Sequence, residues 1–164
     1  MKRLLGVLVI ALFALVACEA EDEAIEDPEP DAEEDAEGPE DDYDLDDQPD
    51  DAAATFESPS DGDTVDSPFT VELAAEGVDL AEAGDPVVGE GHLHVMVDIG
   101  CLDDGEVIPG PSDQAEEEGY WHLGDGSTER EIDLEPGEYE LCVQLGDGPH
   151  RAFGDTDTIT VTVE

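Results

Sequence analysis

Gly91-His92-Leu93-His94-Val95-Met96-Val97-Asp98 has the clearest strand pattern in this 164-residue sequence. Leu93, Val95 and Val97 occupy every second position in it. Successive side chains of a β-strand point to opposite faces, so these apolar residues share one face. The period of two predicts a strand with one face in the hydrophobic core.

Short segments with strand character lie on both sides of residues 91–98. Gly, Pro and Asp separate them, as in the turn Glu135-Pro136-Gly137-Glu138, where Pro and Gly supply the required backbone angles. The other expected strands include Phe69 to Leu73, Tyr120 to Leu123, Glu131 to Leu134, Tyr139 to Leu145 and Thr158 to Val163. About seven short strands at this spacing predict an all-β fold, an immunoglobulin-like antiparallel β-sandwich over residues 55–164.

All four histidines lie between residues 92 and 150. His92 and His94 share one face of the expected strand, because side chains repeat every two residues. Neutral imidazole is a common ligand of copper and zinc, and His122 and His150 come from other segments. Met96 would lie on the face of His92 and His94 and give copper a soft neighbour. The pattern is typical of a copper or zinc site formed by His92, His94, His122 and His150.

The same histidines also fit a structural role. An imidazole at the start of a strand can hydrogen-bond a loop carbonyl or a carboxylate such as Asp98 or Asp147 and hold a loop in place. The sequence leaves the two roles open. Our main expectation is a binding or structural domain, with metal binding as the alternative.

The chain has three cysteines, Cys18 near the start and Cys101 and Cys142 in the expected β-rich part. Lys2 and Arg3 precede an apolar run that ends in Leu15-Val16-Ala17-Cys18, which resembles the lipobox of bacterial lipoproteins. The run is shorter than the roughly 20 residues that span a membrane. We expect residues 1–17 to be a lipoprotein signal peptide, with acyl chains such as palmitate on Cys18. An oxidising compartment then predicts a disulfide between Cys101 and Cys142.

Acidic residues dominate the chain, with 49 Asp and Glu against 4 Lys and Arg. Residues 19–54 hold 20 of the acids, no basic residue and several prolines. This composition cannot bury enough surface to offset the entropy of ordering, so we expect a disordered linker over residues 18–54. The acidity of residues 55–164 favours a halophilic source, because at about 1 M salt the Debye length falls to roughly 3 Å and repulsion fades.

No catalytic arrangement is recognisable, and we expect a protein without enzymatic activity. None of the serines lies in a Gly-x-Ser-x-Gly elbow. The only basic residues after the predicted signal peptide are Arg130 and Arg151. Their scarcity excludes a nucleic-acid-binding surface and a phosphate-binding loop that ends in lysine.

Five motifs occur in order along residues 55–164. They are Phe56-x-x-Pro59-x-x-Gly62, Gly91-His92-x-His94, His122-x-Gly124-x-Gly126, Leu134-x-Pro136-Gly137 and Leu141 to Asp147 ending at His150. This ordered set resembles a bacterial envelope family, domain of unknown function 4399. The resemblance implies a small β-rich exported domain without an assigned activity, whose histidines correspond to the four of this chain. The family's Pro-Gly turn is usually followed by a histidine, whereas this chain has Tyr139.

Together these features predict a lipid-anchored, non-catalytic domain at the cell envelope, in the outer membrane. The expected partners are the membrane, through the lipid, and a protein or glycan.

Overall fold

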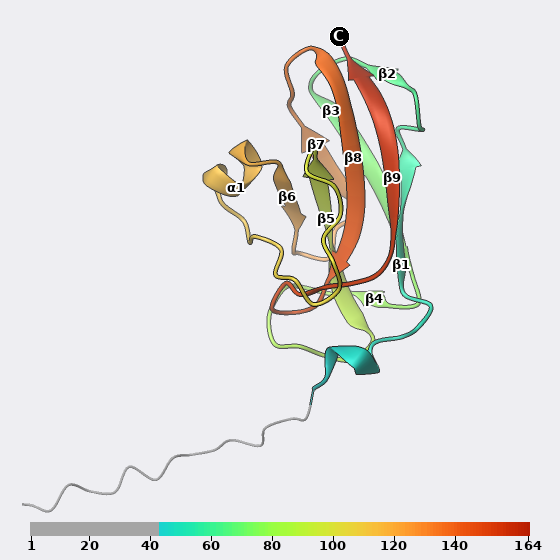
Figure 1. Cartoon of the computed structure of the whole chain (residues 1–164), viewed down its shortest axis with the longest axis vertical. Coiled ribbons are helices and arrows are strands. Elements are labelled where there is room, and N and C mark those ends of the chain that lie inside the picture. Colours follow the sequence, from blue (N-terminus) through green and yellow to red (C-terminus); the bar gives the residue numbers. More distant parts are fainter. Residues whose placement is uncertain (1–42) are drawn as a thin grey trace, which may run out of the picture. The chain divides into compact units, whose positions relative to one another are not determined.

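The computed structural model describes residues 43–164 (Figure 1). The predicted signal peptide, Cys18 and the linker up to residue 42 lie outside the described residues. Strands make up most of the regular secondary structure in the described part, which also has one 3₁₀ turn and one short helix. In chain order the elements are η1 (Leu45–Asp47), β1 (Ala53–Ser58), β2 (Thr64–Val65), β3 (Phe69–Glu76), β4 (Asp79–Leu80), β5 (Glu90–Val97), α1 (Asp113–Glu117), β6 (Tyr120–Leu123), β7 (Glu129–Ile132), β8 (Gly137–Gly146) and β9 (Ala152–Val163).

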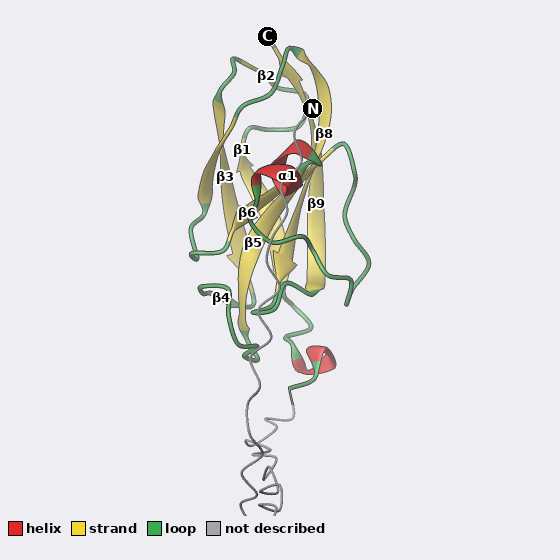
Figure 2. Ribbon diagram, turned by 90° about the vertical axis from the view of Figure 1, so that its left-hand side faces the viewer, coloured by secondary structure: helices red, strands yellow, loops and turns green. Residues whose placement is uncertain are grey.

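The strands form one mixed, curled sheet, as Figures 1 and 2 show. Its order is β4-β5-β8-β9-β1-β3-β7, with β6 paired to β5 and β2 paired to β9. The mostly β prediction is confirmed, but the purely antiparallel arrangement of about seven strands is wrong, because β1 and β2 run parallel to β9 and β4 runs parallel to β5. β2 and β4 have two residues each, too few to show a periodic pattern.

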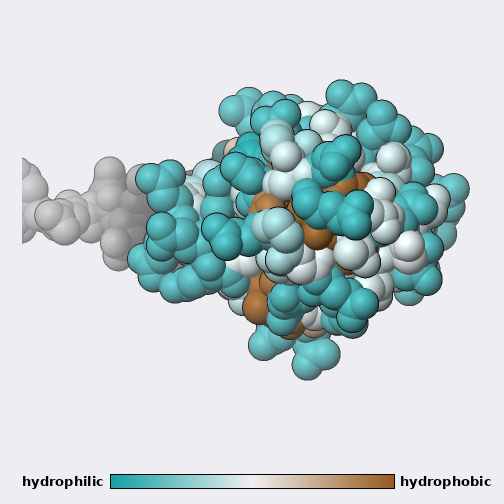
Figure 3. Space-filling model, turned by 90° about the horizontal axis from the view of Figure 1, so that it is seen from above, coloured by the Kyte–Doolittle hydropathy of each residue, from teal (hydrophilic) through white to brown (hydrophobic). Residues whose placement is uncertain are grey.

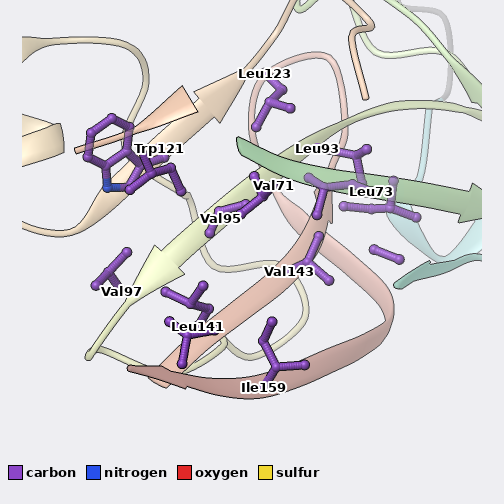
Figure 4. Close-up of a cluster of buried hydrophobic side chains, with 14 of the residues drawn as sticks. Val71, Leu73, Leu93, Val95, Val97, Trp121, Leu123, Leu141, Val143 and Ile159 are labelled. Atoms are coloured by element: carbon purple, nitrogen blue, oxygen red, sulfur yellow. The ribbon is translucent and has the colours of Figure 1, made fainter. Parts of the chain in front are cut away.

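The core lies inside the curl of the sheet and follows the predicted alternation. Leu93, Val95 and Val97 of β5 belong to the same buried cluster as Val71 and Leu73 of β3. Figure 4 shows these side chains with Leu141, Val143 and Ile159 from β8 and β9. Burial of this apolar surface stabilises the fold, at about 25 cal/mol for each Å² removed from water.

The second face of β5 is buried as well. His92, His94 and Met96 lie on it and are at most 1% exposed. The segment after β5 crosses this side of the sheet, and the predicted disulfide between Cys101 and Cys142 is confirmed, with a Cα–Cα distance of 5.6 Å. Leu102 follows Cys101, and its N–H donates to Gln144 Oε1 at 2.9 Å. A strand covered on both faces therefore places polar histidines out of water.

The folded part begins earlier than the predicted boundary at residue 55. β1 starts at Ala53, and Ala52 and Ala54 are 2% and 1% exposed. The preceding Gln48 is 8% exposed and makes four hydrogen bonds. The acidic composition of residues 43–54 gave no sign that they pack on the domain. Gln48 makes its contacts with segments that are distant in the sequence.

The surface is mainly hydrophilic on the face seen in Figure 3, with small hydrophobic patches. Within residues 43–164, no helix has the length and apolar character required to cross a membrane.

Candidate metal centre

Adjacent strands bring three of the histidines together through their register. His92 and His94 lie on β5, and His122 of β6 is the direct cross-strand partner of His94. On the other side of β5, His92 is paired with Gly146 of β8. His150 comes from the turn between β8 and β9, where its φ is 73°, in the left-handed region. The predicted histidines thus share one side of the sheet although they are spread over 59 positions of sequence, from 92 to 150.

The four imidazoles form a compact cluster. One nitrogen of each can be chosen so that all lie within 4.8 Å of one another. The closest contact joins Nε2 of His122 and Nε2 of His150, at 3.0 Å. Tetrahedral zinc with Zn–N bonds near 2.0–2.1 Å has its nitrogens about 3.4 Å apart. Small side-chain movements therefore convert this cluster into a four-coordinate site.

Glycines make the space that the rings occupy. A Cβ at Gly146 would lie 2.8 Å from Nε2 of His94, and a Cβ at Gly124 would lie 1.8 Å from Cε1 of His122. Both distances are below the closest approach of real Cβ atoms, so these two positions require glycine while the rings stay in place. In the sequence Gly124 stands out only as part of a motif, and no local pattern marks Gly146 as a residue of the site.

The buried ring nitrogens lack hydrogen-bond partners among the described residues. These nitrogens are Nε2 of His92 and both Nδ1 and Nε2 of His94. Asp98 Oδ1 instead accepts from the Glu140 N–H, and Asp147 accepts from Arg151 and Tyr43. Among the described residues, no imidazole donates to the carboxylate of Asp98 or Asp147, so the suggested hydrogen bond from an imidazole to one of these carboxylates is wrong. An unpaired buried polar atom is costly, and a metal ion is a partner that removes this cost.

Burial favours the neutral form of His92, His94 and His122. It lowers the pKa of His92 to about 3, with the charges of His122 and His150 acting in the same direction. Burial likewise puts the pKa of His94 well below its ordinary value. The pKa of His122 is lowered first by burial, then by His150 and Arg130, against the opposite effect of Asp125. Neutral imidazole is the form that binds metals.

Lowered pKa values predict acid sensitivity of the metal-free fold. In the unfolded chain His92 takes up a proton as the pH falls through 6.5, whereas in the fold it does so only near pH 3. The stability that the neutral His92 contributes to the fold is therefore fully present above pH 6.5 and is lost as the pH falls from 6.5 toward 3. Between pH 7 and pH 5 we expect His92 alone to lower the unfolding free energy by about 2 kcal/mol. Urea titrations in constant high salt measure this loss, and the His92→Gln variant is the control in which it disappears. Equal losses in both proteins would contradict the prediction.

Substitution of Gly124 tests whether the space that this glycine leaves is needed to position the His122 ring. In Gly124→Ala the new methyl group displaces the His122 ring, and we expect metal affinity to fall roughly 10- to 100-fold. The fold should persist, because His122 is only half-buried and its ring can turn outward. Gly84→Ala is the matched control, since the nearest atom to its Cβ is the Glu82 carbonyl oxygen at 4.0 Å. Equal affinity of Gly124→Ala and Gly84→Ala in isothermal titration would refute the assignment.

Met96 does not join the histidines in the way that the sequence suggested. It lies further along the same face of β5 and packs in a buried cluster with Ile108, Cys142 and Ala152. Its thioether therefore fills the core under the segment that the disulfide holds.

An open pocket of about 460 Å³ leads to the exposed side of the cluster. His122 lies in its wall, together with Asp125, Ser127 and Arg130. His92 and His94 are buried, whereas His122 and His150 are half-buried, so the cluster has one open side. An ion can reach the imidazoles from solvent by way of His122.

Comparison with solved structures gives matches of low sequence identity, and comparison with curated proteins gives no match. Among solved structures, the fibronectin(III)-like modules of Clostridium thermocellum CbhA match with 17% identity and a TM-score of 0.38, over 68% of this chain and 96% of that chain. The endo-beta-1,4-mannanase from Thermotoga petrophila matches with 14% identity and a TM-score of 0.37, over 70% of this chain and 20% of that chain. This chain thus spans about a fifth of the mannanase's length.

The family match covers most of the β-rich part. Residues 71–164, more than half of the chain, match the Domain of unknown function (DUF4399), and this range contains all four histidines and both cysteines of the disulfide. The chain therefore belongs to the DUF4399 family.

Proposed function

We propose that this protein binds a transition-metal ion through His92, His94, His122 and His150. The observation that carries the proposal is the convergence of four imidazoles, three of whose buried ring nitrogens have no hydrogen-bond partner in the described part of the chain. A structural cluster would satisfy these nitrogens with hydrogen bonds, as nearly all buried polar atoms are satisfied. A bound ion uses them as ligands.

Copper and zinc are the ions that suit this donor set. Four neutral imidazoles are borderline nitrogen donors, which copper, zinc and nickel accept, whereas calcium and magnesium require oxygen ligands. Among these divalent ions nitrogen sites bind Cu²⁺ most tightly. The ligands bring no negative charge, but the excess of 49 acidic over 4 basic residues attracts the cation over longer range.

Titration of the metal-free full chain with Cu²⁺ and with Zn²⁺ in high salt tests the proposal. Isothermal calorimetry measures stoichiometry and affinity, and quenching of Trp121, the single tryptophan and the neighbour of His122, reports copper. We expect one ion per chain in the wild type and none in His92→Ala/His94→Ala. Absent binding, or binding unchanged in the variant, would overturn the proposal and leave a structural role for the cluster.

The wider setting that we propose is binding without catalysis, on a lipid-anchored domain at the cell envelope, in the outer membrane. The lipobox-like segment before Cys18 supports lipid attachment. An immunoglobulin-like arrangement is supported by the strand order, in which β9 joins β5 and β8 on one side to β1, β3 and β7 on the other. Mass spectrometry of the protein from membranes checks the anchor: the expected product begins at an acylated Cys18, and an unmodified Cys18 would contradict it.

A further inference from the structure

We infer that the segment Tyr43–Gln48, acting through Asp147 and Arg151, positions His150 for the metal ion. This inference rests on the proposed function and assigns to that site a set of positioning residues outside the ligands. Tyr43 and Gln48 precede β1 and are distant in sequence from every histidine. The contacts that link them to His150 form a continuous chain of hydrogen bonds.

His150 is held in an unusual backbone conformation. Its φ of 73° lies in the left-handed region, which residues with a Cβ seldom adopt. Its N–H donates to the Asp147 carbonyl oxygen at 2.8 Å, and the Asp147 N–H donates to the Arg151 carbonyl oxygen at 3.0 Å. The Ile108 N–H donates to the His150 carbonyl oxygen at 2.8 Å. The direction of the imidazole therefore depends on the turn from Asp147 to Arg151.

The Asp147 carboxylate, with an exposed fraction of 0%, closes this turn. Its Oδ1 accepts from the Arg151 N–H at 2.6 Å, and its Oδ2 accepts from the Arg151 Nε–H at 2.8 Å. Oδ2 also pairs with Nη2 of Arg151 at 2.7 Å. A buried charge bonded in this way is costly to disturb, so it holds the turn in one conformation.

Tyr43 supports Asp147 and Arg151 from outside the turn. Its hydroxyl donates to Oδ2 of Asp147 at 3.1 Å, and the Arg151 guanidinium lies 4.9 Å from the centre of its ring. The ring and the hydroxyl thus contact both members of the ion pair. Such partners of ligand-bearing groups set ligand orientation in metal sites.

Gln48 extends the same support to the chain before His92. Its Nε2 donates to the Tyr43 hydroxyl at 2.9 Å and to the Glu90 carbonyl oxygen at 3.2 Å. Its Oε1 accepts from the Gly89 N–H at 2.8 Å. The segment Tyr43–Gln48 therefore ties the turn that carries His150 to the start of β5, which carries His92 and His94.

The test uses Tyr43→Phe in the full chain, because this change removes one hydroxyl and keeps the ring beneath Arg151. We expect the affinity for Cu²⁺ and for Zn²⁺, each measured alone by titration, to fall roughly 10-fold. Tyr139→Phe is the matched control: the Tyr139 hydroxyl is exposed and donates to the Glu135 carbonyl oxygen at 2.9 Å, so its loss should leave affinity unchanged.

A double-mutant cycle with His150→Ala separates positioning from general stability. If Tyr43 acts through His150, Tyr43→Phe has no further effect on affinity in the His150→Ala background. An equal loss in both backgrounds, or unchanged affinity of Tyr43→Phe in the wild-type background, would overturn the inference while the proposed function stands. Absence of metal binding by the wild type would overturn the proposed function and this inference with it.

Discussion

His94→Ala is expected to lower the affinity for copper or zinc by on the order of a thousandfold or more, since loss of even a ligand's supporting partner costs about 10- to 100-fold. His94 is the most deeply buried ligand, with an exposed fraction of 0%. It faces His122 across β5 and β6 and lies beside His92. Competition titration against a chelator of known affinity measures the loss.

His94→Leu is the second variant of this test, because it fills the volume of the ring without a polar atom. Both ring nitrogens of His94 are buried and have no hydrogen-bond partner among residues 43–164, so their removal should not lower the unfolding free energy. The expected combination is lost metal affinity with retained stability. A protein that keeps its affinity but unfolds more easily would instead identify His94 as structural.

Gln144→Ala is the matched control for His94. Gln144 is the partner of His94 across β5 and β8 and is equally buried, with an exposed fraction of 1%. Its side chain bonds the Leu102 backbone through Oε1 and Nε2 and contributes no metal ligand. We expect Gln144→Ala to lose stability and keep its metal affinity, the opposite of His94→Leu.

The second large effect is expected for removal of the disulfide. Cys101 and Cys142 are 41 residues apart, and closing a loop of that length restricts the unfolded chain. In the chain-entropy treatment the bond contributes about 4 kcal/mol, close to a thousandfold in the unfolding equilibrium. The Cys101→Ala/Cys142→Ala variant should therefore unfold at clearly lower urea concentration than the wild type.

The comparison requires constant high salt, so that repulsion among the acidic residues is equal in both proteins. Reduction of the wild type by a phosphine should produce the same loss, and the reductant should leave the double variant unchanged. Coincident unfolding curves of the wild type and the variant would contradict a stabilising bond. The cysteines pack in the buried cluster of Met96 and Ile108 and are not among the four candidate ligands, so metal affinity should change little in the folded variant.

Much of the fold was predictable because it depends on local periodicity. The alternation of Leu93, Val95 and Val97 survives as the core face of β5, and Phe69, Val71 and Leu73 lie inward on β3. These patterns need no knowledge of distant residues, since one strand's side chains alternate wherever it is placed. The two-residue strands β2 and β4 and the parallel pairing to β9 escaped prediction, because pairing partners are chosen by the whole sheet.

The sequence by itself determined the composition of the site: four histidines, two of them on one face of a strand, and a cysteine pair in a strongly acidic chain. Only the tertiary structure decided that His122 lies opposite His94, that His150 turns inward, and that Gly124 and Gly146 leave room for the rings. It also decided that the segment with Tyr43 and Gln48 packs on the fold. The physical reason is that register, turn geometry and burial are properties of segments brought together from distant parts of the chain, and local residue patterns contain no information on which segments meet.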